Sequence, residues 1–123
     1  LGGTIKQFFA NKPVEIWGDG SSVRDFIYIN DLMTAFESCI KSSCHLGSVN
    51  IGGGIGTSLS EICALIESHS GSELLKIYKQ STSLLVDYSV LDISAAKYIL
   101  GWNPVYSITD GIGQTLSRDL YQP

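Results

Sequence analysis

The chain has 123 residues, 44% of them hydrophobic and 16% charged, a composition typical of one globular domain with its own core. Its formal net charge is −4 and its eight basic residues are scattered, which argues against a nucleic-acid-binding surface. No apolar run approaches the ~20 residues that span a bilayer, and the first residues lack a signal-peptide pattern. We therefore expect a cytoplasmic protein without a membrane partner.

The three cysteines, an odd number, also favour a reducing compartment. Cys39, Cys44 and His45 are close in sequence but lack the paired spacing and the fourth ligand of structural zinc sites. We expect no bound metal.

In chain order, the pattern first predicts a helix over residues 4–11, ended by the following proline, and a strand over 14–17. A turn at 18–22 leads to a second, buried strand over 26–29. Asp31 then stands where it can cap the next helix.

That helix carries one apolar stripe, made of Leu32, Phe36, Cys39 and Ile40. A third strand is expected over 48–51, followed by a glycine loop over 52–56. Residues 58–61 form an S-x-x-E capping box, which predicts a helix with Leu59, Ile62, Cys63 and Ile66 on its inner face. His69 falls at the end of that helix, where it should be solvated.

A fourth strand is expected over 74–78, whereas residues 80–91 are ambiguous between loop and strand. A helix over 94–100 should end at Gly101, and a last helix opens at 107 with apolar residues every fourth position. This order predicts a small mixed α/β domain of short strands and helices.

The first candidate site is the segment from Trp17 to Asp25. Arg24 offers a planar fork of donors suited to phosphate, and Trp17 offers a flat face on which a nucleobase can stack. The alternative is structural: Arg24 pairs with Asp25 or another acid, and Trp17 belongs to the core.

The second candidate is the glycine loop 52–56, because a strand, a glycine loop and a helix can present backbone amides to phosphate. Its glycines do not match the G-x-G-x-x-G spacing of dinucleotide-binding loops. A tight turn that uses glycine for positive φ is the better interpretation.

A catalytic set is not recognisable in this sequence. None of the six tyrosines has a lysine four residues later, the pair in which lysine lowers the pKa of tyrosine, and there is no G-x-S-x-G elbow. We expect this chain alone to be inactive.

Several segments together resemble one family. Residues 14–32 (VEIWGDGSSVRDFIYINDL) are similar to the I-x-G-x-G-x-x-x-R-D-F-I-Y-V-x-D stretch of the extended short-chain dehydrogenases. These are NAD-dependent epimerases and dehydratases of sugar nucleotides, such as UDP-glucose 4-epimerases. Residues 49–52, 91–104 and 107–112 resemble the later motifs Y-N-I-G, D-x-S-K-A-x-x-x-L-G-W-x-P and S-L-x-x-G-I, in family order.

The resemblance implies that the chain is the carboxy-terminal, sugar-nucleotide-binding domain of such an enzyme, spanning residues 1–123 without the NAD-binding Rossmann domain. By the same resemblance, Arg24 would bind the pyrophosphate and Asn50 a phosphate, while Glu15, Ile16 and Trp17 would line the base, partly through backbone groups. The ligand would be a UDP- or dTDP-sugar. Asp25 and Asp31 would be structural, and this chain would hold no cofactor, since NAD belongs to the missing domain.

Two positions depart from the family. An arginine and an aspartate that hold phosphate and ribose in many members fall near Thr82 and Leu85 here. Asp87 lies two residues beyond the second position, and Lys79 could replace the charge of the arginine.

Three hypotheses remain open at the level of sequence. The chain could be the substrate domain of an epimerase or dehydratase, or a stand-alone fragment whose uncovered apolar face makes it a dimer or larger. A third possibility, a small dinucleotide binder that uses the glycine loop, predicts NAD binding, which we do not expect.

Overall fold

The computed structural model describes residues 1–43, 47–80 and 86–117. The described elements, in chain order, are α1 (Gly2–Phe9), β1 (Val14–Trp17), β2 (Val23–Asp25), α2 (Ile29–Lys41), β3 (Gly56–Ser58), α3 (Leu59–Ser70), β4 (Lys76–Lys79), β5 (Tyr88–Ser89), α4 (Ser94–Leu100) and α5 (Ile108–Ser117). The predicted mixed α/β fold of short elements is confirmed.

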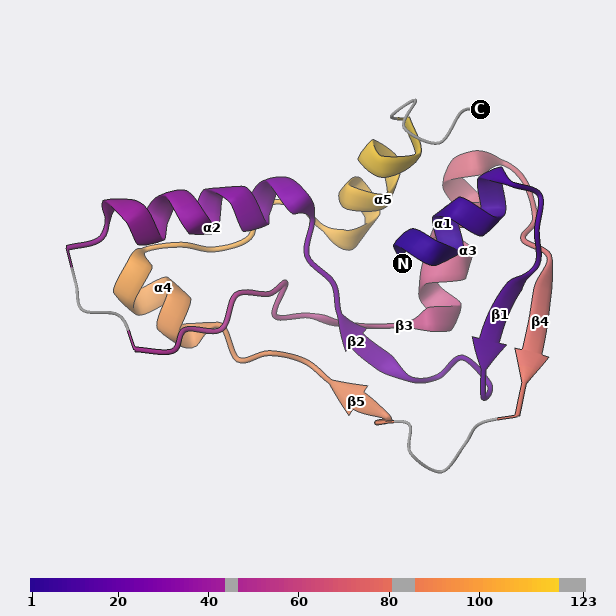
Figure 1. Ribbon diagram of the computed structural model, residues 1–123, viewed down its shortest axis with the longest axis horizontal. Helices are drawn as coiled ribbons and strands as arrows, with labels where there is room; N and C mark the ends of the chain where they lie inside the picture. The colour runs from indigo at the N-terminus through magenta and orange to yellow at the C-terminus, as the bar shows by residue number, and fades with distance from the viewer. Residues whose placement is uncertain (44–46, 81–85, 118–123) are drawn as a thin grey trace.

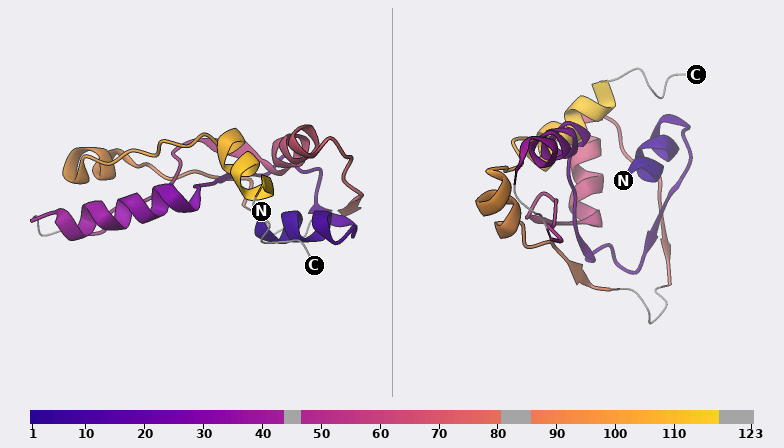
Figure 2. Two further views of the ribbon diagram at one scale, coloured as in Figure 1. Left: turned by 90° about the horizontal axis from the view of Figure 1, so that it is seen from above. Right: turned by 60° about the vertical axis from the view of Figure 1, so that its left-hand side comes forward.

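The molecule is elongated and has two lobes (Figure 1). The compact lobe contains α1, β1, β4, α3 and α5, and Figure 2 shows α1 on the side opposite α3 and α5. The extended lobe contains α2 and α4, and the small sheet of β3, β2 and β5 lies between the two lobes. In this sheet β2 pairs antiparallel with β3 and parallel with β5.

The main core fills the compact lobe. It is built from one side of β1 together with the inner faces of the helices, and its buried members are Ile5, Val14, Ile16, Ile62, Cys63, Ile66, Leu74 and Ile112. The predicted inner face of α3 is confirmed for Ile62, Cys63 and Ile66. His69, at the end of this helix, is exposed as expected.

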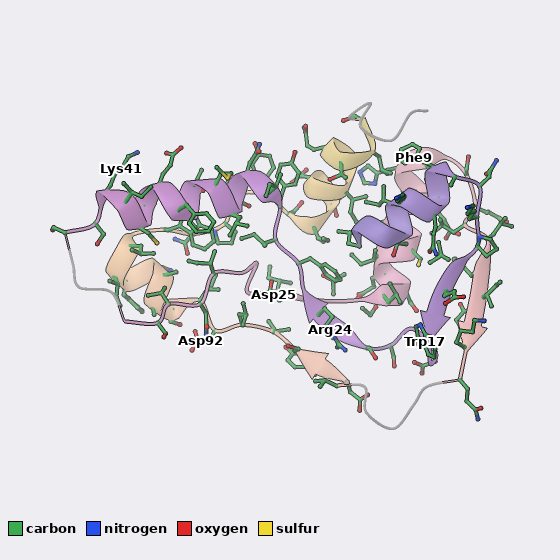
Figure 3. All side chains as sticks on the ribbon, viewed as in Figure 1. Phe9, Trp17, Arg24, Asp25, Lys41 and Asp92 are labelled. Carbon is green, nitrogen blue, oxygen red and sulfur yellow. The ribbon has the colours of Figure 1, made fainter. Side chains whose placement is uncertain are left out.

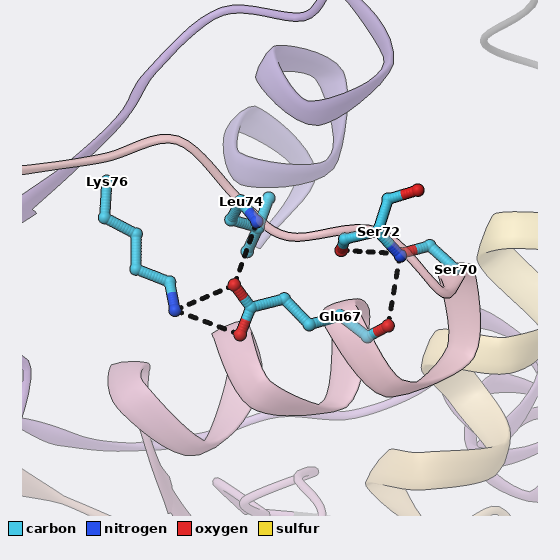
Figure 4. A network of polar contacts seen from close by, with 5 residues as sticks. All are labelled: Glu67, Ser70, Ser72, Leu74 and Lys76. Carbon is cyan, nitrogen blue, oxygen red and sulfur yellow. Dashed lines mark hydrogen bonds and ion pairs between the residues drawn. The ribbon is translucent and has the colours of Figure 1, made fainter.

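A polar network joins the start of β4 to α3 (Figure 4). The Glu67 carboxylate accepts hydrogen bonds from the Leu74 amide, at 2.8 Å, and from the Lys76 ammonium, at 3.0 Å. It ties the segment that follows α3 back to the helix. The parallel ladder of β1 and β4 then places Trp17 opposite Lys79.

A smaller cluster lies in the extended lobe, where Ala35 of α2 packs with Ala96 of α4 and with Trp102. The Trp102 indole N–H donates to Thr34 Oγ1 at 2.9 Å, which satisfies the polar atom of this buried ring. The Val49 and Ile51 side chains pack against the cluster. Residues 48–51 serve this cluster without forming the expected strand, because no strand in the described ranges pairs with them.

Two expectations for the segment after β2 are wrong. The strand expected at 26–29 lies earlier, at Val23–Asp25, because residues 26–28 have no strand beside them and Ile29 already begins α2. Asp31 does not cap α2, since the N-cap is Tyr28. Asp31 is buried and accepts hydrogen bonds from the amides of Val105 and Tyr106, both at 3.0 Å.

The expected apolar stripe of α2 is also not a core face. Phe36 is 56% exposed and Ile40 is 84% exposed, whereas the buried positions of this helix are Asp31 and Ala35. The reason is that α4 and Trp102 pack against the Ala35 side of the helix. The outer side of α2 therefore carries uncovered apolar side chains.

Candidate functional site

A groove of about 160 Å³ lies at the junction of β1, β2 and the first turn of α3. Its lining residues are Trp17, Ser22, Arg24, Phe26 and Leu59. They combine a cation, an aromatic face and a short apolar wall. Figure 3 shows Arg24 on β2 and Trp17 at the end of β1, on either side of the turn that joins these strands.

Trp17 reaches this groove because of the alternation of β1. Successive side chains of a strand point to opposite faces, so Val14 and Ile16 enter the core while Glu15 and Trp17 face outward. Ile16 is 1% exposed, whereas Trp17 is 48% exposed. The structural alternative in which Trp17 belongs to the core is therefore wrong, and the Ile16 side chain does not face the groove.

The turn between β1 and β2 is held by glycine geometry and by α3. Gly18 and Gly20 have φ values of 77° and 82°, in the left-handed region that favours glycine. A Cβ at Gly20 would collide with the Ser60 hydroxyl. The Gly20 carbonyl accepts from the Ser60 amide at 3.0 Å, so the turn is fixed to the start of α3.

The backbone amides of the first turn of α3 donate to acceptors within the protein. The Leu59 amide donates to the Ser22 carbonyl, and the Glu61 amide donates to the Ser58 hydroxyl. With the bond from Ser60, the first three amides of the helix are satisfied, and the predicted capping box is confirmed. Among the described residues that line this groove, Arg24 is the cation that can meet an anion.

Arg24 and Asp25 are neighbours in β2 with different partners. The Asp25 carboxylate accepts from the amides of Gly53, Gly54 and Leu91, at 2.6, 3.0 and 3.2 Å. The Arg24 guanidinium donates to the Val23 carbonyl at 2.7 Å, and within the described residues it forms no ion pair with a carboxylate. The alternative in which Arg24 pairs with Asp25 is therefore wrong.

The glycine loop serves Asp25 and not a phosphate. The amides of Gly53 and Gly54 donate hydrogen bonds to the Asp25 carboxylate. A Cβ at Gly53 would lie 2.5 Å from the Phe26 carbonyl oxygen, so only glycine fits at this position. Gly54 has a φ of 69°, as expected for a tight turn. This loop therefore closes onto β2 and does not offer these amides to a dinucleotide.

Asn50 does not line this groove. Its side-chain amide donates to the Asp92 carbonyl at 3.2 Å, and Figure 3 shows Asp92 toward the extended lobe, away from Trp17. The Asp92 carboxylate in turn accepts from the Ser94 amide at 2.9 Å, and hydrogen bonds from the side chain and then the amide of Ser94 lower the pKa of Asp92. In this structure Asn50 links two segments of the chain.

Other sequence candidates lie partly outside the described residues. These are Thr82, Leu85, Cys44 and His45. The two departures from the family at Thr82 and Leu85, and the expectation that Cys39, Cys44 and His45 bind no zinc, therefore stay predictions from the sequence. Within the described residues, no group of three histidine, cysteine or acidic side chains is placed to hold a metal. No helix in this part of the chain is both long and apolar enough to cross a bilayer.

The sequence did not single out three of the lining residues. Phe26 belongs to the same motif as Arg24, and its aromatic character is the available signal, but the strand-like pattern of residues 26–29 predicts a buried position for it. Ser22 and Leu59 reach the groove only because the turn folds onto α3 through the bonds described above. Their role depends on this tertiary contact and has no local signature.

Comparison with known proteins gives a consistent family. Residues 1–52 match the model of the NAD dependent epimerase/dehydratase family. A UDP-glucuronate 4-epimerase of Thermodesulfobacterium geofontis is 34% identical over 116 residues, covering 92% of this chain and 35% of the relative. An uncharacterized UDP-glucose epimerase of Bacillus subtilis is 33% identical, with 96% and 38% covered.

Solved structures agree. The fold matches UDP-glucose 4-epimerase of Thermotoga maritima, solved with UDP-glucose, with a TM-score of 0.83, 30% identity, and 92% and 36% of the two chains covered. It matches UDP-glucuronic acid 4-epimerase of Bacillus cereus, solved with UDP-glucuronic acid and NAD, with a TM-score of 0.80, 32% identity, and 89% and 35% covered.

The chain thus spans about a third of the length of the relatives that it matches. The chain is similar to the NAD-dependent epimerases and dehydratases over this third of their length and has the fold of the carboxy-terminal part of these enzymes.

Proposed function

We propose that residues 1–123 form a sugar-nucleotide-binding domain that holds the nucleoside diphosphate of a UDP- or dTDP-sugar in the groove of Trp17 and Arg24. The observation that carries the proposal is the separation of Arg24 from Asp25. The carboxylate accepts three backbone amides, and within the described residues the guanidinium beside it forms no ion pair, so its charge is available to a ligand.

The groove has the chemistry for this ligand. An arginine can form two parallel hydrogen bonds to phosphate oxygens, and a half-exposed indole can stack on a pyrimidine base. The matched structures support the class of ligand, because they are described with UDP-glucose and with UDP-glucuronic acid.

We further propose that the hydride chemistry of the family belongs to the other two thirds of these enzymes. The relative from Bacillus cereus was solved with NAD as well as the sugar nucleotide. In this chain the glycine loop is occupied by Asp25, and the sequence contains no tyrosine with a lysine four residues later. The contribution of this domain is to bind and position the substrate.

Isothermal titration calorimetry with UDP, dTDP and their glucose derivatives tests the proposal. We expect saturable binding that Arg24→Ala weakens at least about tenfold, since a charge-assisted hydrogen bond contributes ~1.5–3 kcal/mol. Lys41→Ala removes the same charge from the far end of α2 and should leave the affinity unchanged. Equal affinity of the parent and the Arg24 variant would contradict the proposal.

The outer side of α2 favours a second function, self-association. Its exposed apolar residues are Ile29, Met33, Phe36 and Ile40. They are spaced four, three and four residues apart, which is the seam of a pair of packed helices. This spacing reads the same in both directions, so an antiparallel second copy of α2 would place Ile29 against Ile40 and Met33 against Phe36.

We therefore propose that two copies of this chain pair through α2 in a two-fold arrangement. Four side chains supply less area than a standard interface of about 800 Å² per partner, so the dimer should be weak. Sedimentation velocity should show a concentration-dependent dimer for the parent and a monomer for Phe36→Glu. The control Ile55→Glu changes an apolar residue outside α2 that is 73% exposed, against 56% for Phe36, and should still dimerise. A parent that stays monomeric at all concentrations would contradict the pairing.

A further inference from the structure

A cavity of about 260 Å³ lies where α1, α5 and the start of α2 meet (Figure 1). Ile5 of α1 and Ile112 of α5 line it and are buried, so they form its floor. Leu1, Ile29 and Tyr106 also line it and are exposed, so they form its rim. The cavity therefore opens to the surface beside the first residue of α2.

The lining of this cavity favours an apolar side chain as its occupant. The Ser107 hydroxyl donates to the Asp110 carboxylate, and the Thr115 hydroxyl donates to the Gly111 carbonyl. Both hydroxyls are therefore engaged at the start of α5 and within it. The volume also lies below the ~300–1,000 Å³ of pockets for drug-sized ligands. A single side chain from another protein surface is a better match in size.

The cavity continues the apolar outer side of α2. Ile29 belongs both to the rim of the cavity and to the row of exposed residues on that helix. In the antiparallel pairing of two copies, Ile29 lies against Ile40 of the second copy. Ile40 is 84% exposed, the largest fraction among the large apolar side chains of the described residues. The pairing thus brings the most exposed of these side chains to the rim of a cavity in the other copy.

We propose that Ile40 of each copy inserts into this cavity of the other copy and anchors the α2 pair. This inference rests on the self-association proposed above and names its anchor. Two-fold symmetry places the contact at both ends of the pair of helices. It also adds to an interface that four side chains leave smaller than the standard size. An apolar side chain enclosed in a pocket contributes more to binding than one at a solvated rim.

Two glycines at the start of α1 provide a matched pair of variants. Gly2 lines the cavity and Gly3 does not. A Cβ at either position would have no neighbour within 4 Å, and leucine is a better helix former than glycine, so both substitutions should preserve α1. Gly2→Leu should occupy the cavity from within its own chain and exclude Ile40, whereas Gly3→Leu should leave the cavity open.

The test is sedimentation velocity over a concentration series for the parent, Ile40→Ala, Gly2→Leu and the controls Gly3→Leu and Tyr98→Ala. Tyr98 is as exposed as Ile40 but belongs to α4, which packs against the other side of α2. We expect Ile40→Ala to weaken dimerisation at least about a hundredfold, because each dimer loses two buried side chains. Gly2→Leu should weaken it at least about tenfold, and both controls should match the parent. Circular dichroism confirms that each variant is folded.

The outcomes separate the anchor from the pairing itself. A parent that dimerises, with Gly2→Leu as tight as Gly3→Leu, overturns the role of the cavity and leaves the pairing through α2 in place. An equal loss in both glycine variants also overturns that role, because the surface of α1 would then be the contact. A parent that stays monomeric at all concentrations overturns the pairing, and the anchor with it.

Discussion

Arg24 and Asp25 show how consecutive charges in one short strand take different roles. Asp25 faces the glycine loop and accepts three amides, whereas Arg24 borders the groove. The two side chains of a strand alternate in direction, and this keeps the guanidinium away from its neighbouring carboxylate. Asp25 thus organises the loops around β2, and Arg24 is left to meet an anion.

Asp25→Ala should destabilise the fold strongly. It leaves the amides of Gly53, Gly54 and Leu91 without their acceptor, and we expect a loss of roughly 3 kcal/mol, within the range for hydrogen bonds to a charged group. Urea denaturation at neutral pH measures this loss. The exposed control Asp19→Ala removes a carboxylate whose described bonds go only to Ser21, and it should change stability much less. Equal effects of the two substitutions would show that the Asp25 network is not structural.

At the scale of elements, the start of α3 is hydrogen-bonded to the turn between β1 and β2. Ser58 and Glu61 form the reciprocal bonds of a capping box, and Glu61 has a lowered pKa because the Ser58 hydroxyl and amide donate to it. The amides of Leu59 and Ser60 bond to the turn that carries the groove. The helix start therefore positions the groove as well as beginning α3.

Ser58→Ala removes the cap and should cost about 1 kcal/mol of stability. Because the cap lies next to the groove, we also expect a smaller loss of UDP affinity than in Arg24→Ala. Thermal denaturation and calorimetry of the same variant give the two values. Ser68→Ala, in an exposed position of the same helix, is the matched control, and a stability loss as large in the control would argue against the capping role.

The Glu67–Lys76 pair makes the link between α3 and β4 dependent on pH. The hydrogen bond from Lys76, followed by that from the Leu74 amide, lowers the pKa of Glu67 from its ordinary value of 4.5. A carboxyl whose pKa is lower in the folded state stabilises the protein above its unfolded pKa and loses that contribution as pH falls through the folded pKa. The parent should therefore lose stability below about pH 4.5 more steeply than Glu67→Gln.

At about pH 7, where the carboxylate is charged, Glu67→Gln should be less stable than the parent by about 1 kcal/mol. Urea midpoints of both proteins across this pH range measure the difference. The gap between them should close in acid. A gap that is constant with pH would show that the charge of Glu67 contributes nothing to the folded state.

Elements with a strong local signal could be predicted from the sequence, and those that depend on a partner could not. The S-x-x-E box at Ser58 and the left-handed Gly101 after α4 are local signals, and both are confirmed. Residues 26–29 and 48–51 have strand-like composition, yet neither range forms the expected strand. Composition favours an extended backbone, but a strand requires a neighbour, and the sequence does not reveal which neighbour is present.

The same limit applies to the groove. Arg24 and Trp17 could be identified because the R-D-F motif and an aromatic residue at the end of a strand are visible along the chain. Asn50 could not be excluded, since its bond to the Asp92 carbonyl joins positions 42 residues apart. Ser22 and Leu59 reach the groove through the same kind of distant contact.

At the scale of the whole molecule, the two lobes have different surfaces. The compact lobe encloses the main core and carries the groove, whereas the extended lobe exposes the apolar outer side of α2. Because these sites lie on separate lobes, ligand binding and self-association should be independent. Phe36→Glu should abolish the dimer while its UDP affinity equals that of the parent, which the same calorimetric titration can measure.

The fluorescence of Trp17 during a titration with UDP tests the central claim most directly. Trp17 is half-exposed in the groove and Trp102 is buried in the extended lobe, so a stacked base should change the emission of Trp17 alone. We predict a saturable change with UDP that is lost in Trp17→Phe and shifted to at least about tenfold higher concentration in Arg24→Ala. A parent chain that binds UDP by calorimetry with no change in Trp17 emission would place the ligand elsewhere and contradict the account.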